Sequence, residues 1–149
     1  MGMGYGPLPL QKEHNGCTFV HMSHPLHSFG FYKLEAWRES HKFTLMIYEA
    51  TTNFPEHERY GVTNQVRRAS SSIGAQIAEG SRMSTMVHRK LYYDRAYASG
   101  AEVANFLELA HDLHYIIDNK YLELMEQCNC VCALVFKLSR ACLSITTHA

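Results

Sequence analysis

The stretch YLELMEQCNCVCALVFKLSRAC, residues 121–142, carries the clearest structural signal in the sequence. Its apolar side chains recur three and four residues apart, and this spacing places them on one face of an α-helix. Because the pattern repeats every seven residues, it is typical of a helix that packs in a bundle. It predicts a helix over residues 119–143 with a core face formed by Tyr121, Leu124, Cys128, Val131, Val135, Leu138 and Cys142.

The same kind of spacing predicts two helices before this one. A helix over residues 84–115 has Ser84 at its start, where a hydroxyl can accept a backbone N–H. A helix over residues 56–79 is followed by Gly80, and glycine adopts the left-handed conformation of a C-terminal cap without penalty. The predicted core faces are Ala96, Ser99, Val103, Leu107 and Ala110 in the later helix and Val62, Val66, Ala69, Ile73 and Ile77 in the earlier one.

A further helix is predicted over residues 33–52, ended by Pro55 because the residue before a proline is pushed out of helical geometry. Its expected core face is Leu34, Trp37, Leu45 and Tyr48, flanked by Ile47. Four long helices with short connections and no strand pattern predict an all-α fold, an antiparallel up-down-up-down four-helix bundle, over residues 32–149. Residues 1–31, which contain glycine, proline and histidine without helical periodicity, are expected to be a partly disordered extension.

Composition narrows the class of protein. The chain has 14 Lys and Arg residues and 14 Asp and Glu residues, so its overall charge favours neither nucleic acid nor an anionic membrane. No stretch approaches the roughly 18 consecutive apolar residues of a membrane span, and the start of the chain has no basic region followed by an apolar run. Five cysteines are an odd number that suits free thiols in a reducing compartment. We expect a soluble cytosolic protein with no membrane partner.

The charges are nevertheless segregated along the chain. Residues 59–95 contain seven basic and two acidic side chains, a balance of +5, whereas residues 100–127 contain six acidic and one basic side chain, a balance of −5. Three interpretations remain: a basic face that binds phosphates of RNA or DNA, contacts between basic and acidic faces of identical subunits, or a solvated surface whose ion pairs contribute little. The candidate nucleic-acid-binding or assembly residues are Arg59, Arg67, Arg68, Arg82, Arg89, Lys90 and Arg95.

The residues do not predict a metal site or a cofactor. On a helix Cys128 and Cys132 share a face while Cys130 points away, so three thiolates cannot converge on one zinc ion. No nucleophile, base or phosphate-loop signature stands in a convincing context, and we predict no enzymatic activity. Two alternatives stay open: a metal-dependent bundle enzyme that uses Glu108 and His111, which form one Glu-x-x-His motif, and a purely structural oligomer.

The segment from Trp37 to Arg82 and its flanks contain several short motifs in a fixed order. They are Leu34-Glu35-Ala36-Trp37, Ile47-Tyr48-Glu49, Phe54-Pro55, Glu58-Arg59-Tyr60-Gly61, Arg67-Arg68-Ala69 and Ala75-Gln76-Ile77-Ala78-Glu79-Gly80. With these motifs the chain resembles the four-helix bundle family encoded in intervening sequences of bacterial 23S ribosomal RNA genes. The resemblance extends more loosely to residue 143. It departs from the family at Gln76, where the family usually has Asn, and in the N-terminal extension, which has no counterpart.

That family is similar in fold to the accessory variability protein of diversity-generating retroelements, a pentameric barrel that binds a reverse transcriptase and nucleic acid. The resemblance therefore implies a bacterial cytosolic homo-oligomer, a pentamer, with RNA, DNA or a polymerase as a further partner. The family has no established enzymatic activity, which agrees with the prediction from the residues.

Overall fold

The computed structural model describes residues 29–146 and, within the last helix, side chains up to residue 143. Of the residues expected to form an extension, 1–28 lie outside the described part. The described chain begins with a 3-10 turn, η1 (Gly30–Lys33), and a second 3-10 turn, η2 (Glu56–Glu58), lies between the first two long helices. The four long helices are α1 (Glu35–Ala50), α2 (Val62–Arg82), α3 (Met86–Asp112) and α4 (Asp118–Thr146).

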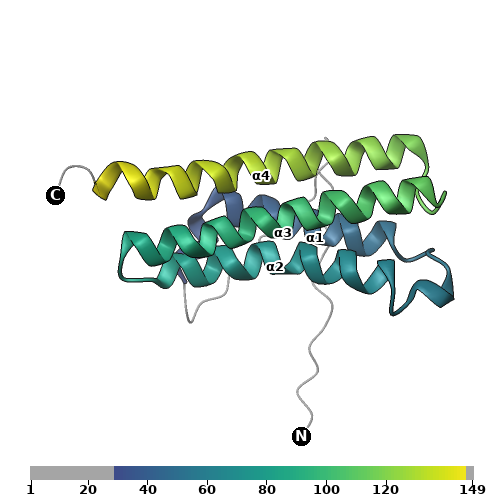
Figure 1. Cartoon of the computed structure of the whole chain (residues 1–149), viewed down its shortest axis with the longest axis horizontal. Helices are drawn as coiled ribbons and strands as arrows, with labels where there is room; N and C mark the ends of the chain where they lie inside the picture. The colour runs from purple at the N-terminus through teal and green to yellow at the C-terminus, as the bar shows by residue number, and fades with distance from the viewer. Residues whose placement is uncertain (1–28, 147–149) are drawn as a thin grey trace, which may run out of the picture.

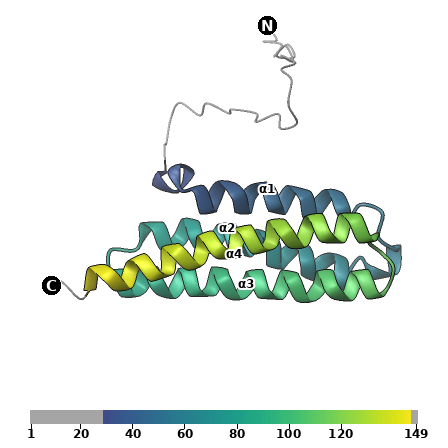
Figure 2. The ribbon, with the colours of Figure 1, turned by 90° about the horizontal axis from the view of Figure 1, so that it is seen from above.

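The helices form the predicted antiparallel up-down-up-down bundle (Figure 1). Each helix packs against the next one along the chain, and α4 closes the bundle by packing against α1. Figures 1 and 2 together place α1 diagonally opposite α3 and α2 diagonally opposite α4. The α1–α2 edge and the α3–α4 edge are therefore on opposite sides of the molecule. Within residues 29–146, no helix is long and apolar enough to cross a membrane.

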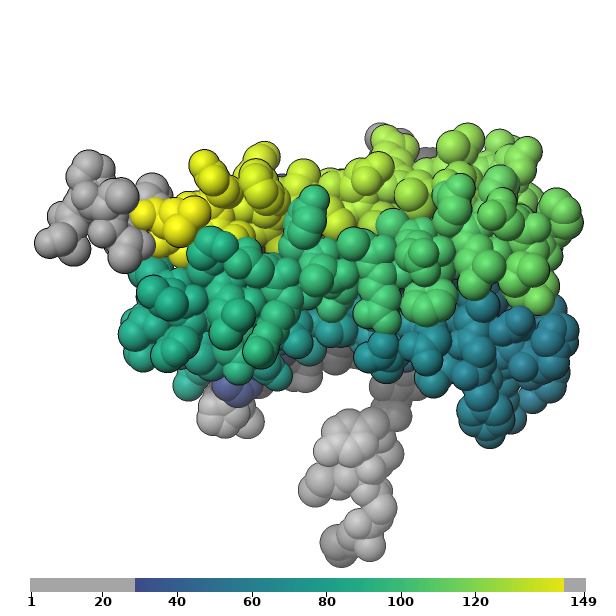
Figure 3. Space-filling view, viewed as in Figure 1, coloured from purple at the N-terminus to yellow at the C-terminus, as the bar shows by residue number. Residues whose placement is uncertain are grey.

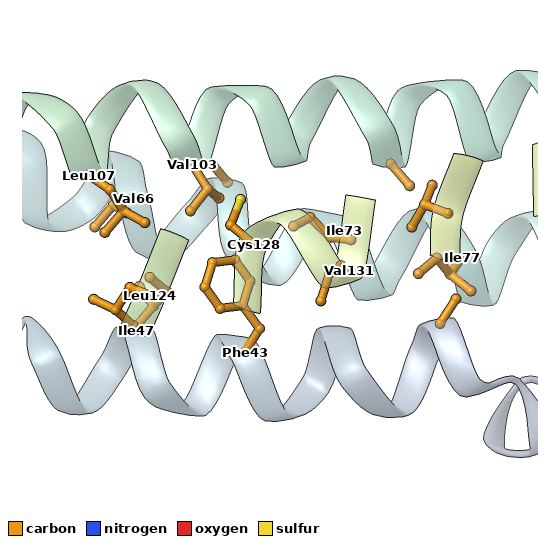
Figure 4. Packing of buried hydrophobic residues seen from close by; sticks show 14 of the residues in the cluster. Phe43, Ile47, Val66, Ile73, Ile77, Val103, Leu107, Leu124, Cys128 and Val131 are labelled. Carbon is orange, nitrogen blue, oxygen red and sulfur yellow. The ribbon is translucent and has the colours of Figure 1, made fainter. Parts of the chain in front are cut away.

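All four helices contribute side chains to one apolar core (Figure 4). In α2, the whole predicted stripe from Val62 to Ile77 is buried, which confirms that prediction. In α4, the seven-residue repeat is confirmed as the core face, with Tyr121 and Leu138 half-buried at its margin. The fully buried side chains of greatest volume include Phe43, Ile47, Val66, Ile73, Ile77, Val103, Leu107, Leu124, Val131 and Val135.

The predicted core face of α1 is confirmed at Leu34 and Trp37, which are partly buried against the core, but is wrong at Leu45 and Tyr48. Leu45 is 58% exposed and Tyr48 is 46% exposed, whereas the buried residues of the helix are Ala36, Ser40, Phe43 and Ile47. Small side chains decide which face of α1 turns toward α2. Ser40 of α1 lies so close to Gly74 of α2 that a Cβ on Gly74 would be 3.3 Å from Ser40 Oγ. A polar residue that bonds within its own helix, as Ser40 does to the carbonyl of Trp37 at 2.8 Å, can occupy the core without a penalty for an unpaired hydroxyl.

Two predicted helix ends also differ from the structure. Gly80 does not cap α2 but lies buried within it, and the helix continues to Arg82. A Cβ on Gly80 would lie 2.8 Å from Cε1 of Tyr93, so the glycine is required by the close approach of α3. The cap of α3 is Thr85 rather than Ser84, because the Thr85 hydroxyl accepts the backbone N–H of His88 at 3.2 Å.

Candidate assembly and nucleic-acid surfaces

Arg67 and Arg68, adjacent on α2, face different neighbours. The Arg67 guanidinium donates from Nε to Thr51 Oγ1 at 2.7 Å and lies 4.8 Å from the centre of the Tyr48 ring, so it attaches α2 to the end of α1. Arg68 points toward α3 and donates to the carboxylate of Glu102 at 2.6 Å. The 100° turn per residue of a helix accounts for the divergence. These two arginines therefore do not form one phosphate-binding site.

Arg89 and Lys90, at the start of α3, are likewise held by the bundle. Arg89 donates from Nε to the carbonyl oxygen of Met83 at 2.8 Å, which braces the turn between α2 and α3. Lys90 pairs with Asp94 at 2.5 Å, and Asp94 also accepts the hydroxyl of Ser139 from α4 at 2.5 Å. Partial burial opposes ionisation of Asp94, but the hydrogen bonds from Lys90 and Ser139 outweigh it and lower the pKa of Asp94.

The three remaining candidates, Arg59, Arg82 and Arg95, are exposed. Arg59 pairs with Glu56 at 3.3 Å in the turn before α2. Arg82 lies 5.8 Å from the centre of the Phe29 ring, and Arg95 lies 5.4 Å from the centre of the Tyr92 ring. The seven candidates are thus divided between the two ends of the bundle and do not share one face.

Basic side chains gather instead at the end of the bundle where α2 ends and α3 begins. We call this the basic end. In addition to the Lys90–Asp94 pair, it carries arginines and lysines that form no ion pair with a carboxylate among the described residues. They come from all four helices and from η1, and are Lys33, Arg38, Arg82, Arg89, Arg95, Lys137 and Arg140.

The opposite end of the bundle is acidic and rich in histidine. His111 bonds through Nε2 to Asp118 at 2.9 Å and stacks on Tyr121 with ring centres 4.2 Å apart. The Tyr121 hydroxyl donates to Glu108, and this hydrogen bond raises the pKa of Tyr121. A shallow cavity of about 420 Å³ lies beside His111 and Asp118. Glu108 and His111 are thus engaged with different partners, and among residues 29–146 no three His, Cys, Asp or Glu side chains are placed to hold a metal ion.

The cysteines of α4 lie as their spacing predicts. Cys128 is buried and Cys132 half-buried on the face toward α3, while Cys130 is exposed. Cys128 donates from Sγ to the carbonyl oxygen of Gly100 at 3.5 Å. A hydrogen bond to Cys132 and burial raise the pKa of the Cys128 thiol, and the same bond lowers that of Cys132. Both thiols are part of the α3–α4 contact.

Sequence reasoning missed a second apolar surface, on the outside of α3 and α4. We call it the outer face. In α3, Val87, Leu91 and Leu109 lie opposite the buried residues, and Tyr97 lies on the side toward α4. In α4, Leu122, Phe136 and Leu143 are exposed and are fourteen and seven residues apart. The side of α3 seen in Figure 3 is covered by no other described segment. The outer face consists of Val87, Leu91, Tyr97, Leu109, Leu122, Phe136 and Leu143. The sequence signal that could have revealed the outer face is the presence of apolar residues on two sides of α3.

A groove runs along the opposite edge, between α1 and α2. Its volume is about 230 Å³. Small side chains of α2 form its floor, and Trp37, with the His41 ring stacked 5.1 Å away, forms the α1 wall. Phe31 closes one end by packing on Trp37 with ring centres 5.0 Å apart. The residues that line the groove are Phe31, Trp37, His41, Thr44, Ser71, Gly74, Ala75 and Ala78.

Comparison with known proteins establishes the family. The model of the 23S rRNA-intervening sequence protein family matches residues 32–137, which is most of the chain and nearly all of the bundle. The chain belongs to this family. The match leaves out residues 1–31 and the end of α4 after residue 137.

One solved structure with this fold is a protein of unknown function from the S23 ribosomal protein family of Bacteroides thetaiotaomicron VPI-5482. It is 21% identical, covers 70% of this chain and 97% of its own length, and has a TM-score of 0.63. At this identity the likeness shows the fold alone. No curated protein matches this intervening sequence protein.

Proposed function

We propose that this intervening sequence protein is a non-enzymatic, cytosolic scaffold that works as a homo-oligomer. The observation that carries the proposal is the outer face. A helix that is apolar on opposite sides is typical of a helix that is buried on both, and a row of large exposed apolar side chains marks an interaction site. The resemblance to the accessory variability protein implies five copies.

The oligomer is tested by measuring the mass of the tag-free protein by analytical ultracentrifugation over a range of concentrations. Replacing Leu122 by glutamate places a charge on the outer face at a side chain that is 62% exposed, so the fold should persist while assembly weakens. Cys130→Glu introduces the same charge on an exposed side of α4 away from the outer face and is the matched control. A wild type that remains monomeric at every concentration would refute the scaffold.

A second candidate function is binding of RNA or DNA at the basic end, alone or together with a polymerase. The clustering of arginines and lysines without carboxylate partners favours it, because each neutralised phosphate releases condensed counterions. This site replaces the single basic face expected from the sequence with a surface built from all four helices.

Fluorescent structured RNA and duplex DNA, titrated over a salt series, test this candidate. Arg82→Glu and Arg95→Glu should weaken binding and reduce its salt dependence, since both side chains are exposed and neither braces the fold. Arg59→Glu, an exposed arginine at the opposite end, is the control and should bind as the wild type does. Equal binding by all three variants would refute the basic end as the site.

A further inference from the structure

The groove between α1 and α2 continues along α1 as a row of apolar and aromatic side chains. The row consists of Trp37, His41, Leu45 and Tyr48, which are spaced four, four and three residues apart and therefore share one side of the helix. Leu45 and Tyr48 are exposed, so residues 29–146 leave this side of α1 uncovered. A helix that is apolar on two sides is typically buried on both. The groove and this row together suit an apolar occupant.

The chain enters the described part of the structure at one end of this groove. Phe31 packs on Trp37 in the groove wall, and Phe29 stacks on Phe31 with ring centres 5.7 Å apart. The guanidinium of Arg82 lies 5.8 Å from the centre of the Phe29 ring. Arg82 follows Ala78 of the groove floor by four residues, which is about one helical turn. The chain that precedes Phe29 is therefore attached at the end of the groove floor.

The length of chain before Phe29 is sufficient to cover the whole groove. The Thr44 hydroxyl donates to the carbonyl oxygen of Ser70 at 3.0 Å, and because α1 and α2 are antiparallel this contact places Tyr48 level with Val66. From the level of Arg82 to that of Val66 the distance is about 24 Å at 1.5 Å per helical residue. An extended chain rises about 3.3 Å per residue, so about eight residues span this distance. Residues 21–28 are enough.

The chemistry of this segment matches that of the groove. From residue 14 to residue 32 the sequence contains no Lys, Arg, Asp or Glu, and it has large apolar side chains at Met22 and Leu26. The residues that line the groove carry no Lys, Arg, Asp or Glu either. Burying the segment there removes no formally charged group from water, whereas a nucleic-acid backbone would lose the hydration of its phosphates. Pro25 also favours an extended chain, which lowers the entropy cost of docking.

The wall of the groove offers a hydrogen-bond donor to an extended chain. Trp37 Nε1 faces the floor, 3.8 Å from the position of a Cβ on Gly74. Its N–H donates to no acceptor among residues 29–146. Every residue of an extended segment carries a backbone carbonyl oxygen that can accept such a bond. The small side chains of the floor leave room above them for larger ones.

The covalent connection favours the segment of the same chain over any separate occupant. A segment tethered by a few residues has an effective concentration in the millimolar range at its site. A second copy or another apolar peptide would have to compete with it at that concentration.

We propose that residues 21–28 lie extended along the α1–α2 groove of their own chain. At 3.3 Å per residue, Leu26 is level with Ala75 of the floor, and Met22 reaches the exposed side chains of Leu45 and Tyr48. The segment then covers the second apolar side of α1 and withdraws it from other partners. This inference goes beyond the scaffold proposal and does not depend on it.

The single tryptophan of the chain provides the first test, because Trp37 lines the groove. In the tag-free full-length protein, Leu26→Asp should release the segment and shift the Trp37 emission to longer wavelength. Ser23→Asp is the matched control, since residues 22 and 26 share one face of an extended chain and residue 23 lies on the other. It should emit as the wild type does. Unchanged emission in Leu26→Asp would overturn the proposal, and a shift of the wild type on dilution would then identify a second copy as the occupant.

Limited chymotrypsin cleavage after Leu26 provides the second test, with a variant of the groove. Ala75→Glu blocks the floor from an exposed helical position, and Ala98→Glu places the same charge at an exposed position of α3. Proteolysis follows the fraction of open chains, so a segment docked for about 90% of the time is cut about tenfold more slowly. Ala75→Glu should therefore be cut about tenfold faster than the wild type and Ala98→Glu at the wild-type rate. Cleavage after Tyr5, outside the segment, should be the same in all three. Equal cleavage after Leu26 would refute docking.

A mixture of Ala75→Glu and Leu26→Asp distinguishes the groove of the same chain from that of another copy. The first variant has an intact segment and a blocked groove, and the second has the reverse. Only the Ala75→Glu chains can be cut after Leu26, and they should be cut as fast in the mixture as alone. Protection in the mixture would show that the segment docks on another copy and would overturn the proposal. Sedimentation of Leu26→Asp as the wild type would show that the scaffold proposal stands or fails separately.

Discussion

Replacing Gly80 by alanine should destabilise the bundle, although the same change is favourable in most helices. Alanine in a helix interior is about 1 kcal/mol better than glycine. At Gly80, however, the new Cβ would lie 2.8 Å from Cε1 of Tyr93 and 3.0 Å from Cβ of Tyr92. The second of these atoms is fixed to the α3 backbone, so relief requires the two helices to move apart. Overpacking of this kind costs about 1–3 kcal/mol, and after the gain from alanine we expect a net loss of up to about 2 kcal/mol.

Gly74, in the same helix, provides a matched control. There a Cβ would meet Ser40 Oγ at 3.3 Å and Trp37 Nε1 at 3.8 Å, which is nearly ordinary contact. Gly74→Ala should therefore be neutral or stabilise by up to about 1 kcal/mol. Urea unfolding followed by circular dichroism at one fixed protein concentration measures both changes. If Gly80→Ala proved as stable as Gly74→Ala, the close approach of α2 and α3 at Gly80 would be refuted.

Three further predictions concern single side chains. Asp94→Asn should be less stable than the wild type at neutral pH, because Lys90 and Ser139 together overcome the effect of burial and lower the pKa of Asp94. The difference in stability is complete above the ordinary pKa of 3.8 and disappears as the pH falls through the lowered pKa. Urea unfolding midpoints over a pH series would show this loss. Thr85→Ala should cost about 1 kcal/mol in urea unfolding and Ser84→Ala almost nothing, since only the former hydroxyl caps α3; equal costs would contradict this assignment. In a Cys17→Ser background, Cys130 should react with a thiol reagent in the native state much faster than Cys128, whose thiol is buried and has a raised pKa, and mass spectrometry of the labelled peptides would reveal any reversal.

The core faces of α2 and α4 could be predicted because in each helix the buried residues form an uninterrupted repeat with spacings of three and four residues. In α1 two rows compete, and the sequence contains larger apolar side chains, Leu45 and Tyr48, on the side that the structure exposes. The buried row includes Ala36 and Ser40, and a pattern of apolar residues does not predict that such small or polar side chains are in the core. Which row of α1 is buried depends on the shape of the neighbouring helix. The small residues of α2 allow close approach and favour the row with the smaller side chains, Ala36 and Ser40. Gly80 was misplaced for the same reason, because its role depends on Tyr93 and not on the helix end.

The charge segregation was visible in the sequence, but its arrangement in space was not. Counting charges over the segment of residues 59–95 groups Arg59 with Arg95, although these two residues lie at opposite ends of the bundle. Antiparallel topology brings the end of α2 next to the start of α3 and places the end of α4 at the same end of the bundle, and this folding creates the basic end from distant residues. The partners that occupy Arg67 and Arg68, namely Thr51 and Glu102, depend on helix rotation, which a single sequence does not fix.

The seam between α1 and α4 has a consequence for the order in which the bundle forms. The contacts of α2 with α3 and of α3 with α4 join consecutive segments, so they can form early and rapidly. The seam instead joins the first long helix to the last, as in the hydrogen bond from Gln127 to Glu39, which spans 88 residues at 2.7 Å. During synthesis α1 leaves the ribosome long before its second neighbour exists. We expect α1 to be the last helix to be secured, and amide hydrogen exchange in α1 to be faster than in α3.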